Sequence, residues 1–245
     1  MRATMDAMIL VTGATGTLGR DLVPLLRRRG ADVATLSRAS GDGHRVADLE
    51  TGSGLSAALD GNSTVVHLAA GRDQQLETRT LVEAARAADV GHVVFISIAG
   101  IDEIPFPYYV QKRAAEKVVE QSGLPFSSFR TTQFHPFVVS TFFAPQRRLP
   151  VLFTPRLSVQ PIDTIVVSEV LADLALGEPQ GRIADLGGPE VLTGVELARA
   201  YTSKPVIPFS LLGRTWAGYK TGHHLVPHNL AGGRTFAEYL AAQPE

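Results

Sequence analysis

The sequence contains no cysteine, so disulfides, thiolate catalysis and cysteine-ligated metal sites are excluded. It carries almost no net charge, −1 at pH 7, which offers no electrostatic argument for binding nucleic acid or an anionic membrane. It also lacks any apolar run long enough to span a bilayer. The first residues hold one arginine and no apolar stretch adequate for a secretory signal, so cytoplasm is the expected compartment.

The chain has 245 residues, of which 44% are hydrophobic and 19% charged, as in a globular protein with one substantial core. In the first half, short runs rich in Val, Ile, Leu and Phe alternate with amphipathic stretches. The alternation predicts βαβ units, and the continuous apolar runs predict strands covered on both faces. The fold class expected is therefore α/β, with a doubly wound (Rossmann) parallel sheet. The expected strands are 7–12, 32–37, 63–69, 92–98 and 126–130, and the expected helices are 17–29, 53–59, 73–88 and 108–122.

After about residue 131 the alternation weakens, and prolines interrupt the apolar stretch 136–155. We expect a strand near 157–161, a helix near 163–177, and a helix after Thr193, where Glu196 completes a capping box. No linker separates two independent parts. The prediction is a single domain over 1–245, in which residues 131–245 contribute a smaller, substrate-binding lobe.

Three glycines, Gly13, Gly16 and Gly19, lie where the first strand gives way to the first helix. In a GxxGxxG pattern the first glycine permits the tight turn, the second lets a diphosphate approach the backbone, and the third lets helix and sheet pack closely. The free N–H groups of the helix N-terminus then bind the phosphates. The pattern predicts a dinucleotide site, and the alternative is a glycine-rich turn without a ligand.

The end of the second strand indicates which dinucleotide is bound. A protein specific for NAD usually has an acidic residue here, whereas this chain has Ser37 and Arg38. Arg38 would pair with a 2′-phosphate, which favours NADP(H), while the nearby Asp42 keeps NAD(H) as an alternative. Asp48, with Leu49, follows the third strand and is a candidate contact for the adenine, or alternatively a helix N-cap.

Tyr108 and Lys112 are four residues apart, which places them on one face of the predicted helix after Ser97. A free phenol is a poor acid or base near neutrality, but a nearby ammonium would lower its pKa. The candidate catalytic residues are therefore Tyr108 as proton donor, Lys112 as pKa modifier and ribose anchor, and Ser97 as orienter. The alternative is a half-buried tyrosine and a surface lysine facing Glu116.

The segments VTGATGTLGR, VVHLAAG, VFISIAGID, PYYVQKRAAE and LPFSSFRTTQFH together resemble the short-chain dehydrogenase/reductase superfamily, most of all its atypical, NmrA-like NAD(P)H-binding branch. The resemblance implies a Rossmann domain, a small C-terminal lobe, and either reduction of carbonyl, quinone or aromatic substrates or sensing of the cofactor without turnover. It places the phosphate loop on Gly13, Thr15, Gly16, Thr17, Leu18 and Gly19, and the segment beside the nicotinamide on Ala69, Ala70 and Gly71. Many relatives have their working serine slightly later than Ser97, and a missing oxyanion donor can lower kcat by about 10²–10³.

Other polar residues have two interpretations each. Gln133 and His135 follow the strand 126–130 and would face a substrate or form a structural pair. His223, His224 and His228 are close in sequence, but without a carboxylate pattern they do not predict a metal site. The aromatic residues of the second half are expected to be core, or else the lining of a substrate pocket; they are Phe137, Phe142, Phe143, Phe153 and Trp216.

Three functions remain open. The first is an NADPH-dependent oxidoreductase acting on a small apolar carbonyl or quinone, and the second is a regulator that senses NADP(H). The third is a nucleotide-sugar epimerase or dehydratase, which the short second half disfavours. A small-molecule substrate is the expected partner, and a homodimer or a regulatory partner protein is left open.

Overall fold

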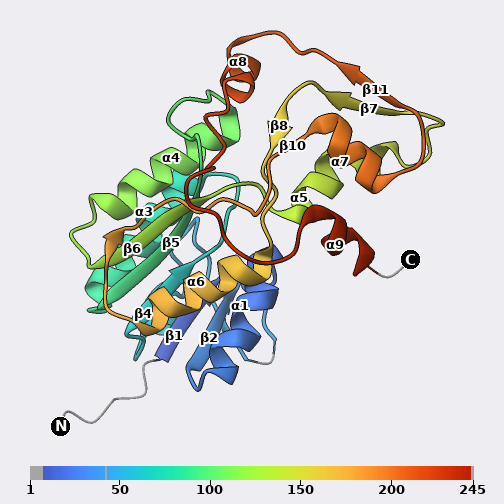
Figure 1. The fold of residues 1–245 in the computed structure, drawn as a ribbon. Helices are drawn as coiled ribbons and strands as arrows, with labels where there is room; N and C mark the ends of the chain where they lie inside the picture. Colours follow the sequence, from blue (N-terminus) through green and yellow to red (C-terminus); the bar gives the residue numbers. More distant parts are fainter. Residues whose placement is uncertain (1–7, 42, 244–245) are drawn as a thin grey trace. The chain divides into compact units, whose positions relative to one another are not determined.

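The computed structural model describes residues 8–41 and 43–243 (Figure 1). The chain divides into two compact units, which we describe separately. The first unit is built from the residues up to Ser97 together with 111–129 and 167–183. The second is built from 98–110, 130–166 and the residues from 184 onward.

The first unit contains a seven-stranded sheet with strand order β3-β2-β1-β4-β5-β6-β9. Neighbouring strands pair in parallel, for example Leu10 with Ala34 and Val65. Buried apolar side chains fill β1 and β4 almost without alternation, as expected for strands covered on both faces. The predicted doubly wound parallel sheet is confirmed. The strands are β1 (Met8–Thr12), β2 (Asp32–Ser37), β3 (His44–Val46), β4 (Thr64–His67), β5 (His92–Ile98), β6 (Phe126–Thr131) and β9 (Gly181–Arg182).

Helices cover the two faces of this sheet. On one face, Arg29 at the end of α1 (Thr17–Arg28) forms an ion pair of 2.5 Å with Asp173 of α6 (Thr164–Leu176). On the other face, α2 (Leu55–Leu59), α3 (Gln74–Ala87) and α4 (Pro107–Glu120) contribute to one apolar core. That core joins strand and helix residues, among them Leu10, Val65, Val93, Phe95, Leu59, Leu81, Ala115 and Val119.

The second unit has two small sheets and short helices. Strands β7 (Leu152–Pro155) and β11 (Val206–Phe209) pair in parallel, and β8 (Ser158–Val159) and β10 (Leu192–Thr193) pair antiparallel. The helices are α5 (His135–Val138), α7 (Gly194–Tyr201), α8 (Arg214–Lys220) and α9 (Phe236–Ala241), and a π-helical turn over Val139–Phe143 continues α5. Their core contains Val138, Phe143, Leu152, Val159, Leu197, Ala198 and Phe236.

Local signals in this unit predicted some elements and not others. The capping box of Thr193 and Glu196 is confirmed at the start of α7. The strand expected near 157–161 is only two residues long, Ser158–Val159, and it pairs with the equally short β10. The expectation that the aromatic residues of the second half are core is wrong for Phe137 and Phe153, which are 47% and 41% exposed. Among the described residues, no helix combines the length and the apolar character needed to cross a membrane.

Candidate functional site

The loop between β1 and α1 is a tight turn that depends on glycine. Gly13 has φ +67°, and a Cβ atom there would come within 2.7 Å of the backbone nitrogen of Ala69. Gly19 lies against the same turn, where a Cβ atom would come within 2.5 Å of the Cα atom of Ala14. The N–H of Gly16 donates to the carbonyl of Gly13 at 3.0 Å and closes the turn. The expected roles of Gly13 in the turn and of Gly19 in close packing agree with these distances.

The N-terminus of α1 is open to an anion. Its N-cap is Gly16, no side chain caps its free N–H groups, and its first turn holds no acidic residue. Thr15, Gly16 and Thr17 are exposed, whereas Leu18 and Gly19 are buried. Free N–H groups at a helix start and the helix dipole together favour negative charge. A diphosphate therefore fits this loop.

A hydrogen-bonded chain of side chains fixes the loop after β4. The hydroxyl of Thr12 accepts from the N–H groups of Leu68 (3.2 Å) and Ala69 (3.1 Å). Its own proton therefore goes to Nδ1 of His67, 2.8 Å away, and Nε2–H of His67 donates to the hydroxyl of Thr78 at 3.0 Å. Burial, together with the charge of Lys112, lowers the pKa of His67 to about 3, so this imidazole is neutral. The sequence analysis did not predict this series of hydrogen bonds, although Thr12 and His67 are polar residues at the ends of two apolar strands.

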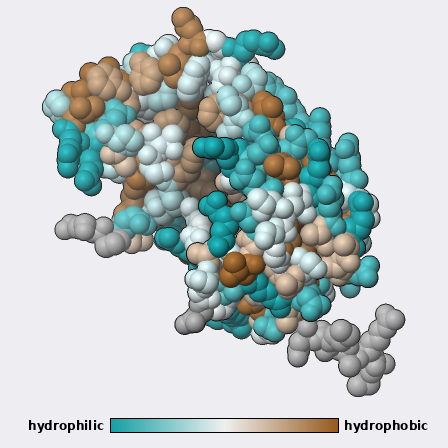
Figure 2. Space-filling view, turned by 180° about the vertical axis from the view of Figure 1, so that it is seen from behind, coloured by the Kyte–Doolittle hydropathy of each residue, from teal (hydrophilic) through white to brown (hydrophobic). Residues whose placement is uncertain are grey.

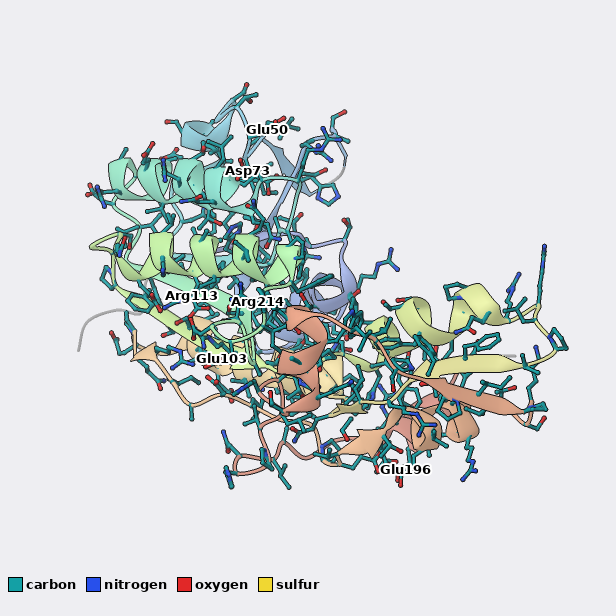
Figure 3. All side chains as sticks on the ribbon, turned by 90° about the horizontal axis from the view of Figure 1, so that it is seen from above. Glu50, Asp73, Glu103, Arg113, Glu196 and Arg214 are labelled. Carbon is teal, nitrogen blue, oxygen red and sulfur yellow. The ribbon has the colours of Figure 1, made fainter. Side chains whose placement is uncertain are left out.

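Residues 69–71, which the resemblance placed beside the nicotinamide, come directly after His67 and Leu68. Ala70 and Gly71 are exposed, and the N–H of Gly71 donates to Oε2 of Glu77 at 2.9 Å. Burial raises the pKa of Glu77, and the hydrogen bond from the Gly71 amide opposes this shift. The negative charges of Glu50 and Asp73 also raise the pKa of Glu77. Figure 3 labels Glu50 and Asp73 on this unit. The charge of Arg38 acts in the opposite direction and lowers the pKa of Glu77.

The residues expected around the adenosine end have different environments. Arg38 is exposed just beyond β2, where the hydroxyl of Ser37 accepts from the N–H of Ala39 at 3.1 Å. Oδ1 of Asp48 accepts from the N–H groups of Glu50 (2.7 Å) and Thr51 (3.2 Å). Asp48 thus caps a turn. The alternative that it is a helix N-cap is wrong, because Gly54 occupies that position for α2.

Leu49 is 8% exposed and packs into the core, so its side chain has no free surface of note for a cofactor. Asp42, which kept NAD(H) as an alternative, lies outside the described residues.

Lys112 is a buried cation on α4. Its residue is 5% exposed, and its Nζ lies 4.4 Å from the centroid of the Phe95 ring. Burial lowers the pKa of Lys112 to about 8, and the attraction of the carboxylate of Glu116 opposes the shift. A lysine of this kind changes its protonation near neutral pH, which a surface lysine does not. The interpretation as a solvated surface residue is therefore wrong.

Ser97 donates its hydroxyl proton to Glu116. The distance from Oγ to Oε2 is 2.5 Å, and both residues are buried. Oε1 of Glu116 lies 3.3 Å from Nη1 of Arg113. The hydroxyl that was expected to orient a substrate instead holds the carboxylate that faces Lys112.

Tyr108 and Tyr109 differ sharply in their surroundings. Tyr108 is 43% exposed, and burial raises its pKa, so the lowering expected from Lys112 is not found. Tyr109 is 4% exposed, and its phenol oxygen accepts from Nε2 of Gln133 at 2.9 Å. Burial also raises the pKa of Tyr109. The structural interpretation of Gln133 is the one that this hydrogen bond supports.

The histidines of the second unit also have structural contacts. Nε2 of His135 is 2.9 Å from the carbonyl of Arg234, and its ring stacks on Tyr239 with centroids 4.9 Å apart. Nε2 of His224 is 2.7 Å from the carbonyl of Ser158. Within residues 8–41 and 43–243, no group of three or more His, Cys, Asp or Glu side chains is arranged to hold a metal ion.

A family profile described as NAD(P)H-binding matches residues 13–135, from the glycine turn to α5. The chain belongs to the NAD(P)H-binding family. The predicted family is thereby confirmed, and so is the expectation that the protein binds a nicotinamide dinucleotide.

Individual relatives of this NAD(P)H-binding protein extend the comparison. It is 30% identical over 213 residues to (4-alkanoyl-5-oxo-2,5-dihydrofuran-3-yl)methyl phosphate reductase of Streptomyces griseus, covering 77% of this chain and 71% of the relative. It is 28% identical over 202 residues to photosystem II assembly factor Ycf39 of Trieres chinensis, covering 74% of this chain but only 63% of the longer relative. The NADPH-dependent quinone oxidoreductase QOR2 of Escherichia coli, solved with NADPH, has the same fold, with a TM-score of 0.80 at 18% identity over 96% of this chain and 99% of that one.

Proposed function

We propose that this protein is an NADPH-dependent oxidoreductase that reduces a small apolar carbonyl or quinone. The observation that carries the proposal is the buried Lys112, whose pKa of about 8 lies in the range where it can assist proton transfer. It belongs to the same compact unit as the glycine turn, and Tyr108 precedes it by one helical turn of α4. A structural lysine would serve stability better on the surface, where its charge stays hydrated.

The residues have distinct roles in this proposal. The N-terminus of α1 binds the diphosphate, and Lys112 hydrogen-bonds the ribose hydroxyls. NADPH, when bound, supplies the hydride. Tyr108 gives a proton to the substrate oxygen as negative charge develops there, and Lys112 stabilises the phenolate that remains. Ser97 is a positioning residue in this scheme, because its hydroxyl donates a hydrogen bond to Glu116. The carboxylate of Glu116 in turn attracts the charge of Lys112.

The preference for NADPH over NADH rests on Arg38. Glu77, Glu50 and Asp73 give this corner negative charge, which repels a 2′-phosphate unless Arg38 offsets it. Hydrogen bonds to charged groups contribute about 1.5–3 kcal/mol, so Arg38→Ala should weaken NADPH binding by about 10- to 100-fold. NADH lacks the 2′-phosphate, and its affinity should change by less than about threefold.

Parallel fluorescence titrations with NADPH and NADH test this preference. The matched control is Arg79→Ala, which removes an exposed arginine of α3 that takes no part in the loop contacts described above. Equal affinity of the unaltered protein for the two nucleotides would show that the assignment of Arg38 is incorrect.

The reaction class is supported by what the relatives do. The Streptomyces griseus protein is a reductase, and the Escherichia coli protein is an NADPH-dependent quinone oxidoreductase. Oxidation of NADPH should be followed at 340 nm with a panel of quinones, aldehydes and ketones. We expect turnover of at least one class, and a loss of about 10²–10⁴-fold in kcat for Tyr108→Phe with NADPH affinity unchanged. A full rate in that variant would remove Tyr108 from the mechanism.

A second candidate function is a regulator that senses the NADP⁺/NADPH ratio without turnover. It is favoured by the engaged hydroxyl of Ser97 and by the raised pKa of Tyr108, which makes the phenol a weaker acid. Firm NADPH binding with no turnover across the panel would decide for this alternative. A partner protein retained on the immobilised chain with NADPH but not with NADP⁺ would then be expected.

A further inference from the structure

Two segments of the second unit are entirely free of acidic residues. Residues 139–162 and 202–213 contain Arg147, Arg148, Arg156 and Lys204 but no Asp or Glu. The whole chain carries −1, so these segments at +4 leave −5 for the remainder. The expectation of no membrane contact depended on the small net charge of the whole chain. That net charge is the sum of a basic part, the two segments, and an acidic remainder.

The two segments come together in the ribbon of β7 and β11, which Figure 1 shows as a paired unit. Phe153 pairs in register with Ile207, and Pro155 with Phe209. Paired residues of parallel strands share a face, and Phe153, Ile207 and Phe209 are 41%, 43% and 36% exposed. Leu149, which precedes β7, is 42% exposed. Figure 2 shows brown hydrophobic residues beside teal hydrophilic ones at the upper left, where this ribbon falls.

The cations lie at both ends of this apolar face. Nζ of Lys204 donates to the carbonyls of Arg147 (2.6 Å) and Leu149 (2.8 Å), which holds residues 147–149 at the start of the ribbon. At the other end, the N–H of Arg156 donates to the carbonyl of Phe209 at 2.8 Å. Arg147, Arg148 and Arg156 are exposed, and in the part of the chain that the structure describes their side chains form no ion pair.

Glu196, the acidic residue of helix α7, is already hydrogen-bonded within its own helix cap. Glu196 lies in the first turn of α7, which contacts both β7 and β11 (Figure 3). Its carboxylate accepts from the N–H and the hydroxyl of Thr193, each at 2.7 Å. It therefore completes the cap of α7 and forms no ion pair with the three arginines.

We propose that the ribbon face, composed of Leu149, Phe153, Ile207 and Phe209 with Arg147, Arg148 and Arg156, docks on an anionic lipid bilayer. Apolar side chains between arginines match the interface of such a bilayer, where the rings enter the acyl boundary and the guanidinium groups meet lipid phosphates. A stable protein–protein interface needs about 800 Å² and 20–30 residues on each partner, and the seven residues of the ribbon face are too few for that. Docking is thus peripheral, reversible and sensitive to salt.

Vesicle co-sedimentation tests the charge part of the proposal. Vesicles of phosphatidylcholine with phosphatidylserine should retain the full chain at low salt, and vesicles of phosphatidylcholine alone should not. The double variant Arg147→Glu/Arg148→Glu should lower retention by tenfold or more, since each basic residue near an anionic surface contributes several-fold. The matched control Arg28→Glu/Lys117→Glu changes net charge equally at exposed positions of α1 and α4 and should bind as the unaltered protein does. No retention of the unaltered protein, or equal loss in both variants, overturns the proposal.

A fluorescent probe tests the apolar part. Trp216 is the only tryptophan of the chain, so Trp216→Phe combined with Phe153→Trp places a single indole in the ribbon face. Its emission should shift to the blue with anionic vesicles, and high salt should reverse the shift. If the indole stays in water while ultracentrifugation shows a dimer that Arg147→Glu/Arg148→Glu dissociates, the lipid surface is refuted and a second copy of the chain covers the face instead.

Discussion

The buried charge of Lys112 should cost the fold stability, and the cost can be worked out from the pKa of this residue. Its ordinary pKa of 10.5 falls to about 8 in the folded protein. The unfolded chain therefore holds the proton more tightly than the folded one, and the difference corresponds to about 3 kcal/mol. Below pH 8 Lys112 is charged in both states and the cost is full. Between about pH 8 and 10.5 only the unfolded chain holds the proton, so the cost fades as pH rises.

Replacement of Lys112 by methionine should therefore stabilise the protein. Lys112→Met keeps the apolar stem over Phe95 and removes the charge, so the free energy of unfolding at pH 7 should rise by about 2–3 kcal/mol. The stability gain should shrink to nearly zero at pH 10.5, and turnover of the proposed reaction should be lost.

Urea denaturation at pH 7, 8.5 and 10 measures this stability change. The matched control is Lys117→Met on the exposed side of the same helix, which should change stability by less than about 0.5 kcal/mol at every pH. If Lys112→Met destabilises the protein at pH 7, or if its effect is the same at pH 7 and pH 10, the buried ammonium is not under the electrostatic strain inferred here.

Three further predictions concern the same unit. His67 has a folded-state pKa of about 3 against 6.5 when unfolded, so stability should fall by about 2 kcal/mol between pH 6.5 and 5, and His67→Gln should flatten that fall in a urea series. Gly13→Ala should lower the free energy of unfolding by about 2 kcal/mol or more and abolish NADPH binding in a titration, because φ is positive and the new Cβ meets Ala69. The control Gly30→Ala, where φ is +87° and the Cβ would lie in open space, should lower it by only about 1 kcal/mol. Ser97→Ala should lower kcat less than tenfold while shifting the pH profile through Glu116, whereas a 10²–10³-fold loss would return Ser97 to the role of oxyanion donor.

Features encoded in a few neighbouring residues were predictable from the sequence. The turn at Gly13, the start of α1 and the capping box of Thr193 each depend on local backbone geometry, and the structure has them where the pattern places them. The parallel sheet was predictable for a similar reason, because continuous apolar runs such as Met8–Thr12 suit a strand covered on both faces.

Contacts between distant segments were not predictable in this way. The hydroxyl of Thr12 meets His67 only because β1 and β4 are neighbours in the sheet, which no spacing in the sequence reveals. The pairing of Ser97 with Glu116 likewise depends on the rotation of α4 against β5. Spacing placed Tyr108 and Lys112 on one helix face, but it carried no information on which of the two adjacent tyrosines is buried.

Exposure in the second half was equally hard to predict. Phe153 was expected in the core because of its residue type, yet it belongs, like the exposed Ile207, to a two-stranded ribbon with one uncovered face. Hydrophobicity alone cannot distinguish a covered strand face from an open one.

Because of the direction of the hydrogen bonds around Thr12, acid should affect the loop after β4 more than the sheet itself. One added proton on His67 would turn Nδ1 from an acceptor into a donor, so the oxygen of Thr12 would face three donors with two lone pairs. One of these hydrogen bonds to the hydroxyl would then break; the amide of Leu68 would keep its bond to the main-chain carbonyl of Thr12, 3.3 Å away. Acidification should therefore loosen residues 68–71, the loop that follows β4, while the parallel sheet keeps its structure.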